Sequence, residues 1–394
     1  MHSLASLLSP YDINSFLSEY WTQKAIFISG GGIKKFENLF SWDKLTYILN
    51  FHELNDSSLT LIKEGKILRT FSNQLNEKNS IIKALQNGAT LKLDNIHQKT
   101  PELDEFVSHL KQDMPNCEMH INTYCSWPDK QGFDYHYDTY EVFVLQIEGK
   151  KEWYVFPDTY IKYPVQYTIS ASSIFTLGEP YLTRVLNPGD LLYIPRGHLH
   201  YAVACEEPSL HLTLGIRCPT GIDFLQWLTQ KLRQKEEWRQ SLPLVRENVS
   251  TTYGEHLESL FQNLIPYISN QDIQAEYLDS IKKLEQPTNA YSLPYQAGFN
   301  IFPQGINTIF KRPGWQRAIT SIINENEYKV RVGNKEVILK PVNEGFVQNL
   351  FSHESFTGSD VVSWLPGLDW ESDVVPILAY LVMEGIIFVD AINN

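Results

Sequence analysis

The stretch D-Y-H-Y-D-T-Y-E-V-F-V-L-Q-I-E-G-K-K-E-W-Y-V-F, residues 134–156, decides the fold class. Most of it consists of two runs rich in valine and aromatic residues on either side of a glycine, which predicts two paired strands. Near its start, His136 and Asp138 stand two residues apart. Because side chains at i and i+2 of a strand point to the same face, this imidazole and this carboxylate should face one side together. Such a pair can hold one metal ion.

The strand pattern extends well beyond this stretch. Residues 117–218 contain further short runs of β-branched and aromatic residues, such as D-L-L-Y-I-P and S-L-H-L-T-L-G-I, separated by turn residues. This spacing predicts an all-β sandwich or barrel. Helical periodicity is expected in residues 1–50, which look amphipathic, and again in residues 220–285. From about residue 326 short strands mix with helical segments.

A third metal ligand is expected in N-P-G-D-L-L-Y-I-P-R-G-H-L-H, residues 187–200. This segment predicts a turn, a strand and a second turn, followed by His198 and His200. We predict His200 as the ligand, because His198 lies nearer the turn. With His136 and Asp138 it would complete a two-histidine, one-carboxylate triad, which leaves coordination positions open. A lone histidine on a β face is more often a hydrogen-bonded core residue, but the combination of both motifs in one β region is far more specific.

Length and composition limit the classes of protein to consider. The chain has 394 residues, which suggests two or three domains, and 43% of them are hydrophobic. Its net charge of -13 argues against binding of nucleic acid, because phosphate binding needs a basic surface. The acidic balance suits a basic protein or peptide partner. No apolar run approaches the ~18 residues that cross a membrane, and the N-terminus lacks a secretory signal pattern.

Cysteine usage predicts the redox compartment. The chain has four cysteines, and none of them forms a C-x-x-C pair, which excludes zinc ribbons and thioredoxin-like motifs. We expect reduced, mostly buried thiols in a cytoplasmic protein. The four are Cys117, Cys125, Cys205 and Cys218.

The motif that contains the first two ligands also carries a family resemblance. H-Y-D-T-Y-E-V-F-V-L-Q-I-E-G-K-K-E-W, residues 136–153, resembles H-x-D-x-x-x-V-F-x-x-Q-x-x-G-x-K/R-x-W of the Jumonji-C branch of the cupin superfamily, the Fe(II)- and 2-oxoglutarate-dependent oxygenases. Within that branch the chain is most similar to the hydroxylases of arginine and histidine in ribosomal proteins. F-L-S-E-Y-W-T-Q-K-A-I-F-I-S-G-G, residues 16–31, resembles their N-terminal motif, with Ala25 where proline is usual.

The resemblance implies an architecture for the whole chain. It implies an α+β fold with a double-stranded β-helix core, the cupin or jelly-roll fold. The catalytic Jumonji-C domain would occupy residues 1–218 and a helical dimerisation domain residues 219–310. A winged-helix-like domain that does not read DNA would occupy residues 311–394. A homodimer is the assembly that follows.

The resemblance also implies roles in the site. The triad would hold Fe(II), with 2-oxoglutarate as co-substrate and O2 as oxidant. Lys151 falls where the family places a cation that pairs with the far carboxylate of 2-oxoglutarate. Asn122 and Tyr124 match positions that contact the co-substrate, with a capping asparagine and a core tyrosine as the alternative roles. His211 could line the same pocket or fill the barrel.

The implied activity is hydroxylation of an unactivated C–H bond in a protein side chain, arginine or histidine of a ribosomal protein. A second hypothesis keeps the chemistry but gives it a ribosomally made peptide or a small molecule, because Ala25 and the loop at 127–130 depart from the family pattern. Lysine demethylation is less favoured, since no chromatin-reader sequence accompanies the domain. A third hypothesis is a non-enzymatic cupin that binds metal for structure or sensing, against which the complete triad and Lys151 argue.

Overall fold

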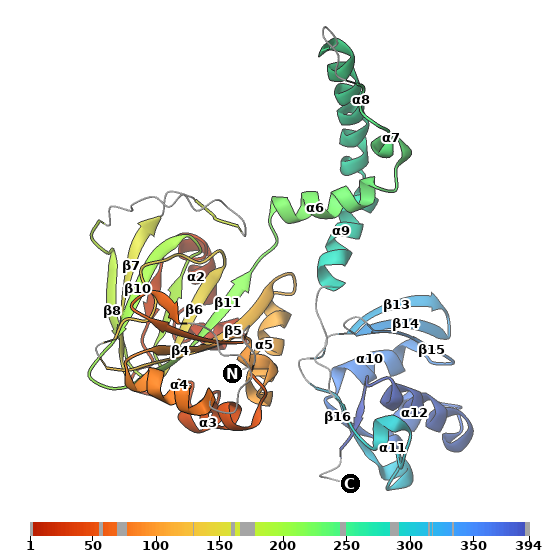
Figure 1. The fold of residues 1–394 in the computed structure, drawn as a ribbon. Coiled ribbons are helices and arrows are strands. Elements are labelled where there is room, and N and C mark those ends of the chain that lie inside the picture. Colours follow the sequence, from red (N-terminus) through yellow and green to blue (C-terminus); the bar gives the residue numbers. More distant parts are fainter. Residues whose placement is uncertain are drawn as a thin grey trace. The chain divides into compact units, whose positions relative to one another are not determined.

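The structure is a computed structural model, shown in Figure 1. The chain divides into two compact units, Met1–Pro219 and Thr220–Asn394, and each is described by itself. The described residues are 3–54, 58–68, 77–128, 130–158, 162–165, 178–244, 250–283, 291–313, 316, 318–332 and 335–390.

The first unit is built on two antiparallel sheets. The larger has the strand order β1-β9-β6-β11-β5-β4-β2-β3, and the smaller the order β10-β7-β8. The larger sheet consists of β1 (Ile26–Ile28), β2 (Leu59–Lys63), β3 (Lys66–Leu68), β4 (Thr90–Leu93), β5 (Glu118–Ser126), β6 (Glu141–Glu148), β9 (Leu191–Ile194) and β11 (Ser209–Arg217). The smaller consists of β7 (Lys151–Asp158), β8 (Leu182–Leu186) and β10 (His198–Ala204).

Helices cover one face of the larger sheet (Figure 1). They form where the sequence supplies caps and an apolar stripe. The Asp12 side chain accepts from the Ser15 amide at the start of the second helix, and Pro101 occupies the first turn of the fifth. The helices are α1 (Leu4–Leu8), α2 (Ile13–Glu19), α3 (Trp42–Phe51), α4 (Glu77–Gln86) and α5 (Pro101–Asp113), with the 3-10 turn η1 (Ile96–Gln98).

The side chains of β11 point alternately to the two faces of the larger sheet, and a separate core lies on each face. Leu210, Leu212 and Leu214 are fully buried in the core beneath the helices, and such burial contributes about 1.5–3 kcal/mol per leucine. His211 and Thr213 belong to the opposite face. On that face a second buried cluster joins residues of β6 and β9 with residues of β7, β8 and β10, so the two sheets face each other. The predicted two-sheet β core is confirmed.

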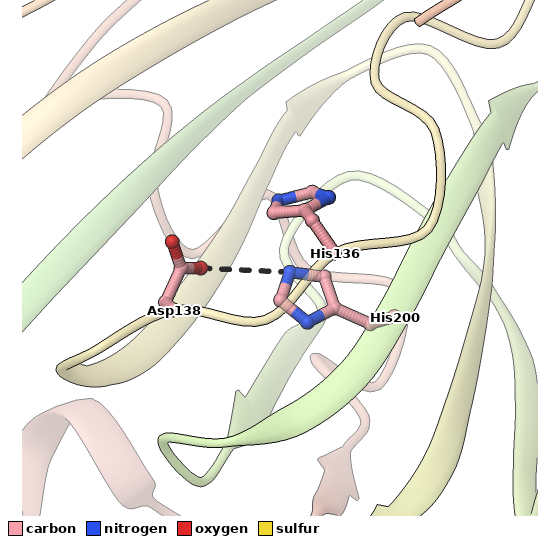
Figure 2. A group of neighbouring side chains, drawn as sticks. All are labelled: His136, Asp138 and His200. Atoms are coloured by element: carbon pink, nitrogen blue, oxygen red, sulfur yellow. Dashed lines mark ion pairs between the residues drawn. The ribbon is translucent and has the colours of Figure 1, made fainter. Parts of the chain in front are cut away.

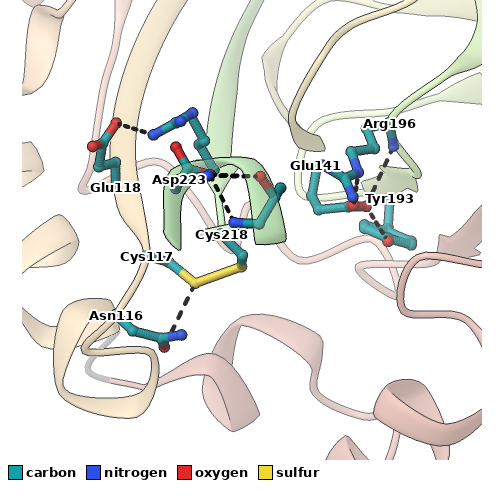
Figure 3. Close-up of a disulfide and its surroundings, with 10 residues drawn as sticks. Asn116, Cys117, Glu118, Glu141, Tyr193, Arg196, Cys218 and Asp223 are labelled. Carbon is teal, nitrogen blue, oxygen red and sulfur yellow. Dashed lines mark hydrogen bonds and ion pairs between the residues drawn. A yellow bond between two sulfur atoms is a disulfide. The ribbon is translucent and has the colours of Figure 1, made fainter. Parts of the chain in front are cut away.

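A disulfide joins Cys117 to Cys218, so the expectation that all four cysteines are reduced is wrong for this pair (Figure 3). The register of β5 and β11 explains the pairing. Arg217 lies opposite Glu118, which places the next pair, Cys218 and Cys117, opposite each other with Cα atoms 4.5 Å apart. This separation is typical of a directly opposed pair in an antiparallel ladder. Cys125 and Cys205 are free thiols.

Reduction of this disulfide should destabilise the first unit. The bond closes a loop with a sequence separation of 101 residues, and constraining such a loop in the unfolded chain is worth about 2–4 kcal/mol. We therefore expect a reductant to lower the free energy of unfolding of this unit by about that amount in urea titrations followed by circular dichroism. The double variant Cys117→Ser/Cys218→Ser should be insensitive to reductant. An intact mass that does not change on reduction of the wild type would contradict the bond.

The second unit combines helices with two small antiparallel sheets, β16-β12-β17 and β13-β14-β15, around its own apolar core. Its strands are β12 (Ile309–Lys311), β13 (Ala318–Asn324), β14 (Glu327–Val332), β15 (Lys335–Leu339), β16 (Ser355–Thr357) and β17 (Phe388–Val389). Its helices are α6 (Gly221–Leu232), α7 (Glu236–Arg239), α8 (Ser250–Ser269), α9 (Gln271–Lys283), α10 (Glu344–Ser352), α11 (Gly358–Trp364) and α12 (Val375–Met383), with the short helical turns η2 (Tyr295–Ala297), η3 (Gly305–Asn307) and η4 (Trp370–Val374). None of the helices in the described ranges has the length and apolar character needed to cross a membrane.

Candidate metal centre

Backbone pairing brings the two predicted metal-binding motifs together. His136 and His200 form a bridge in which each amide donates to the carbonyl of the other, at 3.1 and 2.8 Å. The Gly197 amide donates to the Asp138 carbonyl at 2.9 Å. His200 belongs to β10, as expected, but His136 and Asp138 precede β6 and lie outside the named strands. A single bridge to His200 therefore places His136, and the Gly197 amide places Asp138, rather than a continuous strand.

The three side chains converge on one point (Figure 2). One ligand atom from each of His136, Asp138 and His200 lies within 4.8 Å of the others. The Nε2 atom of His200 is 3.5 Å from Oδ2 of Asp138, and the two imidazole centroids are 4.5 Å apart. This spacing suits coordination of a single ion by three protein ligands.

Both histidines are held in the tautomer that a metal requires. Nδ1 of His136 bonds the carbonyl of Asp134 at 2.8 Å, and Nδ1 of His200 bonds the carbonyl of His198 at 3.0 Å. A carbonyl can only accept, so each Nδ1 carries a proton, and in the neutral form of each ring Nε2 is the nitrogen with a lone pair for a metal. Burial lowers the pKa of His200 to about 4, with the neighbouring His136 adding to the effect. The neutral imidazole is the form that binds metals.

A buried lysine lies in the same cavity as the three ligands. The Lys151 side chain is 4% exposed, and its Nζ donates to Oγ of Ser126 at 3.0 Å. The Thr90 hydroxyl in turn donates to Ser126 at 3.1 Å. Within the described ranges no carboxylate lies at ion-pair distance from Lys151, and burial lowers its pKa to about 8. A buried cation without a counter-ion is costly, so this end of the cavity favours an anionic ligand.

Comparison with protein-family models identifies the domain that contains these residues. A family model described as JmjC domain matches residues 95–224. The chain contains a JmjC domain. The matched range begins before β5 and ends after β11, so it includes the triad and Lys151. The predicted resemblance is thereby confirmed.

Relatives and solved structures support the same assignment. Bifunctional lysine-specific demethylase and histidyl-hydroxylase NO66 of Drosophila persimilis is 29% identical over 281 residues, 68% of this chain and 40% of that protein. Ribosomal oxygenase 1 of Rattus norvegicus is 31% identical over 267 residues, 64% of this chain and 44% of that protein. The chain thus spans less than half the length of these curated relatives.

A solved structure extends the likeness to nearly the whole fold. YcfD, a ribosomal oxygenase from Escherichia coli solved in complex with cobalt and 2-oxoglutarate, superposes with a TM-score of 0.59 at 17% identity, covering 97% of this chain and 99% of that chain. At this identity the likeness concerns the fold. The cupin fold of the JmjC domain, with its mixed helix and sheet content, is confirmed.

Of the remaining predicted site residues of the JmjC domain, two line the cavity and one does not. Tyr124 and His211 are opposite each other on β5 and β11, line the cavity, and stack with centroids 4.9 Å apart. Burial holds the pKa of His211 well below its usual value, and Lys151 adds to the effect. Asn122 is 3% exposed and is not among the residues that line the cavity. Its Oδ1 accepts a hydrogen bond from the Asn95 amide at 3.1 Å, which is a structural contact outside the cavity.

The site residues that the sequence did not indicate include Trp153 and Thr90, which line the cavity, and Ser126, which accepts a hydrogen bond from Lys151. Trp153 lines the cavity beside Lys151, and among the described residues its Nε1 is buried without a hydrogen-bond partner. It stands at i+2 from Lys151, so strand alternation was a usable signal. Ser126 likewise continues the alternation of Tyr124 along β5. Thr90 comes from β4, far away in the sequence, and no local pattern points to it.

His198 braces the JmjC site rather than joining the ligand set. It is 5% exposed, and its Nδ1 is 2.9 Å from the Tyr181 hydroxyl. That hydroxyl accepts from the Ala25 amide at 2.7 Å. A proline has no amide hydrogen and could not make this bond. The Tyr181 contact therefore gives a physical reason why position 25 is not proline.

Proposed function

We propose that this protein is an Fe(II)- and 2-oxoglutarate-dependent oxygenase that hydroxylates a protein side chain. One observation carries the proposal: the triad and the buried Lys151 line the same cavity. A three-ligand metal site beside a buried cation that has no carboxylate partner among the described residues suits a dicarboxylate that chelates the metal at one end. The E. coli ribosomal oxygenase of similar fold was solved with cobalt and 2-oxoglutarate.

The donor set fits Fe(II). Two imidazole Nε2 atoms and one carboxylate form the facial arrangement of non-haem iron oxygenases, which keeps other positions open. Bound Fe(II) would supply the redox chemistry by which one oxygen atom of O2 enters succinate, as 2-oxoglutarate loses CO2, and the other is inserted into a substrate C–H bond. His136, Asp138 and His200 would hold the ion at the cavity wall.

The other cavity residues would bind and orient the co-substrate. Lys151 would neutralise its far carboxylate, with Ser126 and Thr90 fixing the ammonium group. The stacked rings of Tyr124 and His211 form part of the wall beside it. Because His211 is neutral, Lys151 is the charge that selects an anion at this end of the cavity.

For the substrate we propose arginine or histidine in a basic ribosomal protein. Two of the similar proteins are named a histidyl-hydroxylase and a ribosomal oxygenase. The net charge of -13 is complementary to a basic partner and argues against direct contact with nucleic acid. A cytoplasmic location remains a prediction from the sequence.

We further propose that the chain forms a homodimer through the helical segment 219–310, followed by a winged-helix-like domain over 311–394. Exposed apolar side chains on three helices support the dimer, because apolar surface of this kind marks interaction sites. They are Ile222 and Leu225 on α6, Phe261 and Ile265 on α8, and Leu278 on α9, each more than half exposed.

The test is hydroxylation of a defined substrate. The protein would be incubated with Fe(II), 2-oxoglutarate, ascorbate and the ribosomal proteins of its own cells. We expect one ribosomal protein to gain the mass of one oxygen atom, with succinate formed in step. Fragmentation spectra would then locate the oxygen on arginine or histidine.

Two variants control this experiment. Asp138→Ala removes a ligand and should abolish both products, whereas Asp134→Asn changes a nearby acidic residue and should leave them intact, since only the carbonyl of Asp134 contacts His136. Succinate without a modified ribosomal protein, together with an oxidised peptide or metabolite, would favour the tailoring hypothesis. Metal binding without any 2-oxoglutarate turnover would favour a non-enzymatic cupin and overturn the proposal.

A further inference from the structure

Trp153 stands between Lys151 and the third metal ligand along the wall of the cavity. It follows Lys151 by two residues on β7, so both side chains belong to the same face of that strand. Lys151 lies opposite Ala204 of β10 and Trp153 lies opposite Ala202, two residues from His200. The indole centroid is 5.9 Å from Nζ of Lys151 and 6.1 Å from the centroid of the His200 ring. A ligand that reaches from the metal to Lys151 therefore passes the indole.

The indole N–H of Trp153 is a buried donor. The residue is 6% exposed and lines the cavity, and Nε1 has no hydrogen-bond partner within the ranges that the structure describes. Buried polar groups in folded proteins are nearly always paired, so each exception calls for an explanation. An indole nitrogen can only donate. An acceptor oxygen on a ligand in the cavity would therefore satisfy it.

A ring from the opposite sheet holds the indole in place. The imidazole of His211, on β11, makes a T-shaped contact with it, with centroids 5.4 Å apart and planes at 85°. Nδ1 of His211 is also buried with no hydrogen-bond partner in the described part of the chain. Both residues line the cavity. Two neighbouring residues of the cavity wall thus carry a nitrogen that no described residue bonds.

The chemistry of a buried carboxylate calls for a donor beside Lys151. A carboxylate has two oxygens and accepts several hydrogen bonds, and burying it without them is costly. Nζ of Lys151 already donates to Ser126 at 3.0 Å, so the lysine cannot direct all its donors to a ligand. Trp153 offers a further donor on the same face of β7. This donor is neutral and directional, so it adds hydrogen bonding without adding charge.

We propose that Trp153 is a co-substrate-binding residue, whose indole N–H donates to the carboxylate of 2-oxoglutarate that Lys151 neutralises. The inference rests on the function proposed above for the cavity. A hydrogen bond to a charged group is of the stronger kind, and its loss lowers affinity about tenfold to a hundredfold.

The test measures binding of 2-oxoglutarate to the Co(II)-loaded full chain by calorimetry. Trp153→Phe keeps an aromatic ring against His211 and removes the N–H. We expect the Kd for 2-oxoglutarate to rise about tenfold or more, with the affinity for Co(II) unchanged. Oxalate chelates a metal but has no far carboxylate, so its Kd should stay as in the wild type. Incorporation of benzothienylalanine at position 153, which keeps the shape of the indole with sulfur in place of the N–H, should cause the same loss.

Tyr154→Phe is the matched control. It removes a hydroxyl from the next residue of β7, whose hydroxyl donates to Glu152 at 2.6 Å and which is not among the residues that line the cavity. This variant should bind 2-oxoglutarate as the wild type does.

The outcomes separate the inference from the proposed function. Wild-type affinity for 2-oxoglutarate in Trp153→Phe and in the benzothienylalanine protein would limit Trp153 to packing and overturn the inference alone. An equal loss for oxalate would place the indole N–H at the metal end of the ligand and overturn its assignment to the far carboxylate. Failure of the Co(II)-loaded wild type to bind 2-oxoglutarate would overturn the proposed function, and the inference with it.

Discussion

Replacement of His200 by glutamine is expected to weaken Fe(II) or Co(II) binding by more than about 100-fold, and to abolish succinate formation. Loss of a group that only hydrogen-bonds to a metal ligand already weakens metal binding about 10–100-fold, so loss of a ligand itself should cost more. Nε2 of His200 is the free nitrogen that points toward Asp138, so its loss leaves two ligands. Calorimetry with Co(II) under anaerobic conditions measures the affinity directly.

His198→Gln is the matched control for this experiment. His198 lies two residues away on the same strand, but its ring bonds the Tyr181 hydroxyl and its carbonyl holds His200. The substitution keeps that carbonyl, so metal affinity should stay within a few-fold of the wild type. A loss of metal binding in His198→Gln with normal binding in His200→Gln would reverse the ligand assignment.

Replacement of Lys151 by methionine is expected to raise the Kd for 2-oxoglutarate by about two to three orders of magnitude while metal affinity is unchanged. Removing one partner of a buried ion pair costs about 3–5 kcal/mol, and each 1.4 kcal/mol is about tenfold in affinity. Methionine fills similar space without the charge. Quenching of tryptophan fluorescence by 2-oxoglutarate in the Co(II)-loaded protein gives the affinity, because Trp153 lines the same cavity.

The pH dependence of 2-oxoglutarate binding provides an independent check on Lys151. Burial lowers the pKa of Lys151 to about 8 in the ligand-free protein. A lysine is charged below its pKa, so the wild type should lose affinity for the dianion as the pH rises above about 8. Lys151→Arg keeps its charge throughout and should not show this loss. A wild-type affinity that is flat from pH 7 to about 9.5 would contradict the assigned role of Lys151.

The sequence indicated residues of the candidate site where they lie on one strand or in one motif. The motif around His136 and Asp138 indicated Lys151. The expected strand face shared by His136 and Asp138 is not what brings them together, because both residues precede β6. Alternation with a period of two is a local property of the chain, so it can be read without knowing the partner strand. The same alternation places Trp153 on the face of β7 that carries Lys151.

What only the tertiary structure decided is which strands lie opposite each other. The bridge between His136 and His200, the Thr90–Ser126–Lys151 chain and the contact between Trp153 and His211 all depend on how distant segments are placed.

The cysteines make the same point most clearly. Their spacing in sequence gave no sign of a pair, and the register of β5 with β11 places Cys117 against Cys218. Register is fixed by which faces of two strands can be buried together, and that choice is made by the whole core rather than by either strand alone.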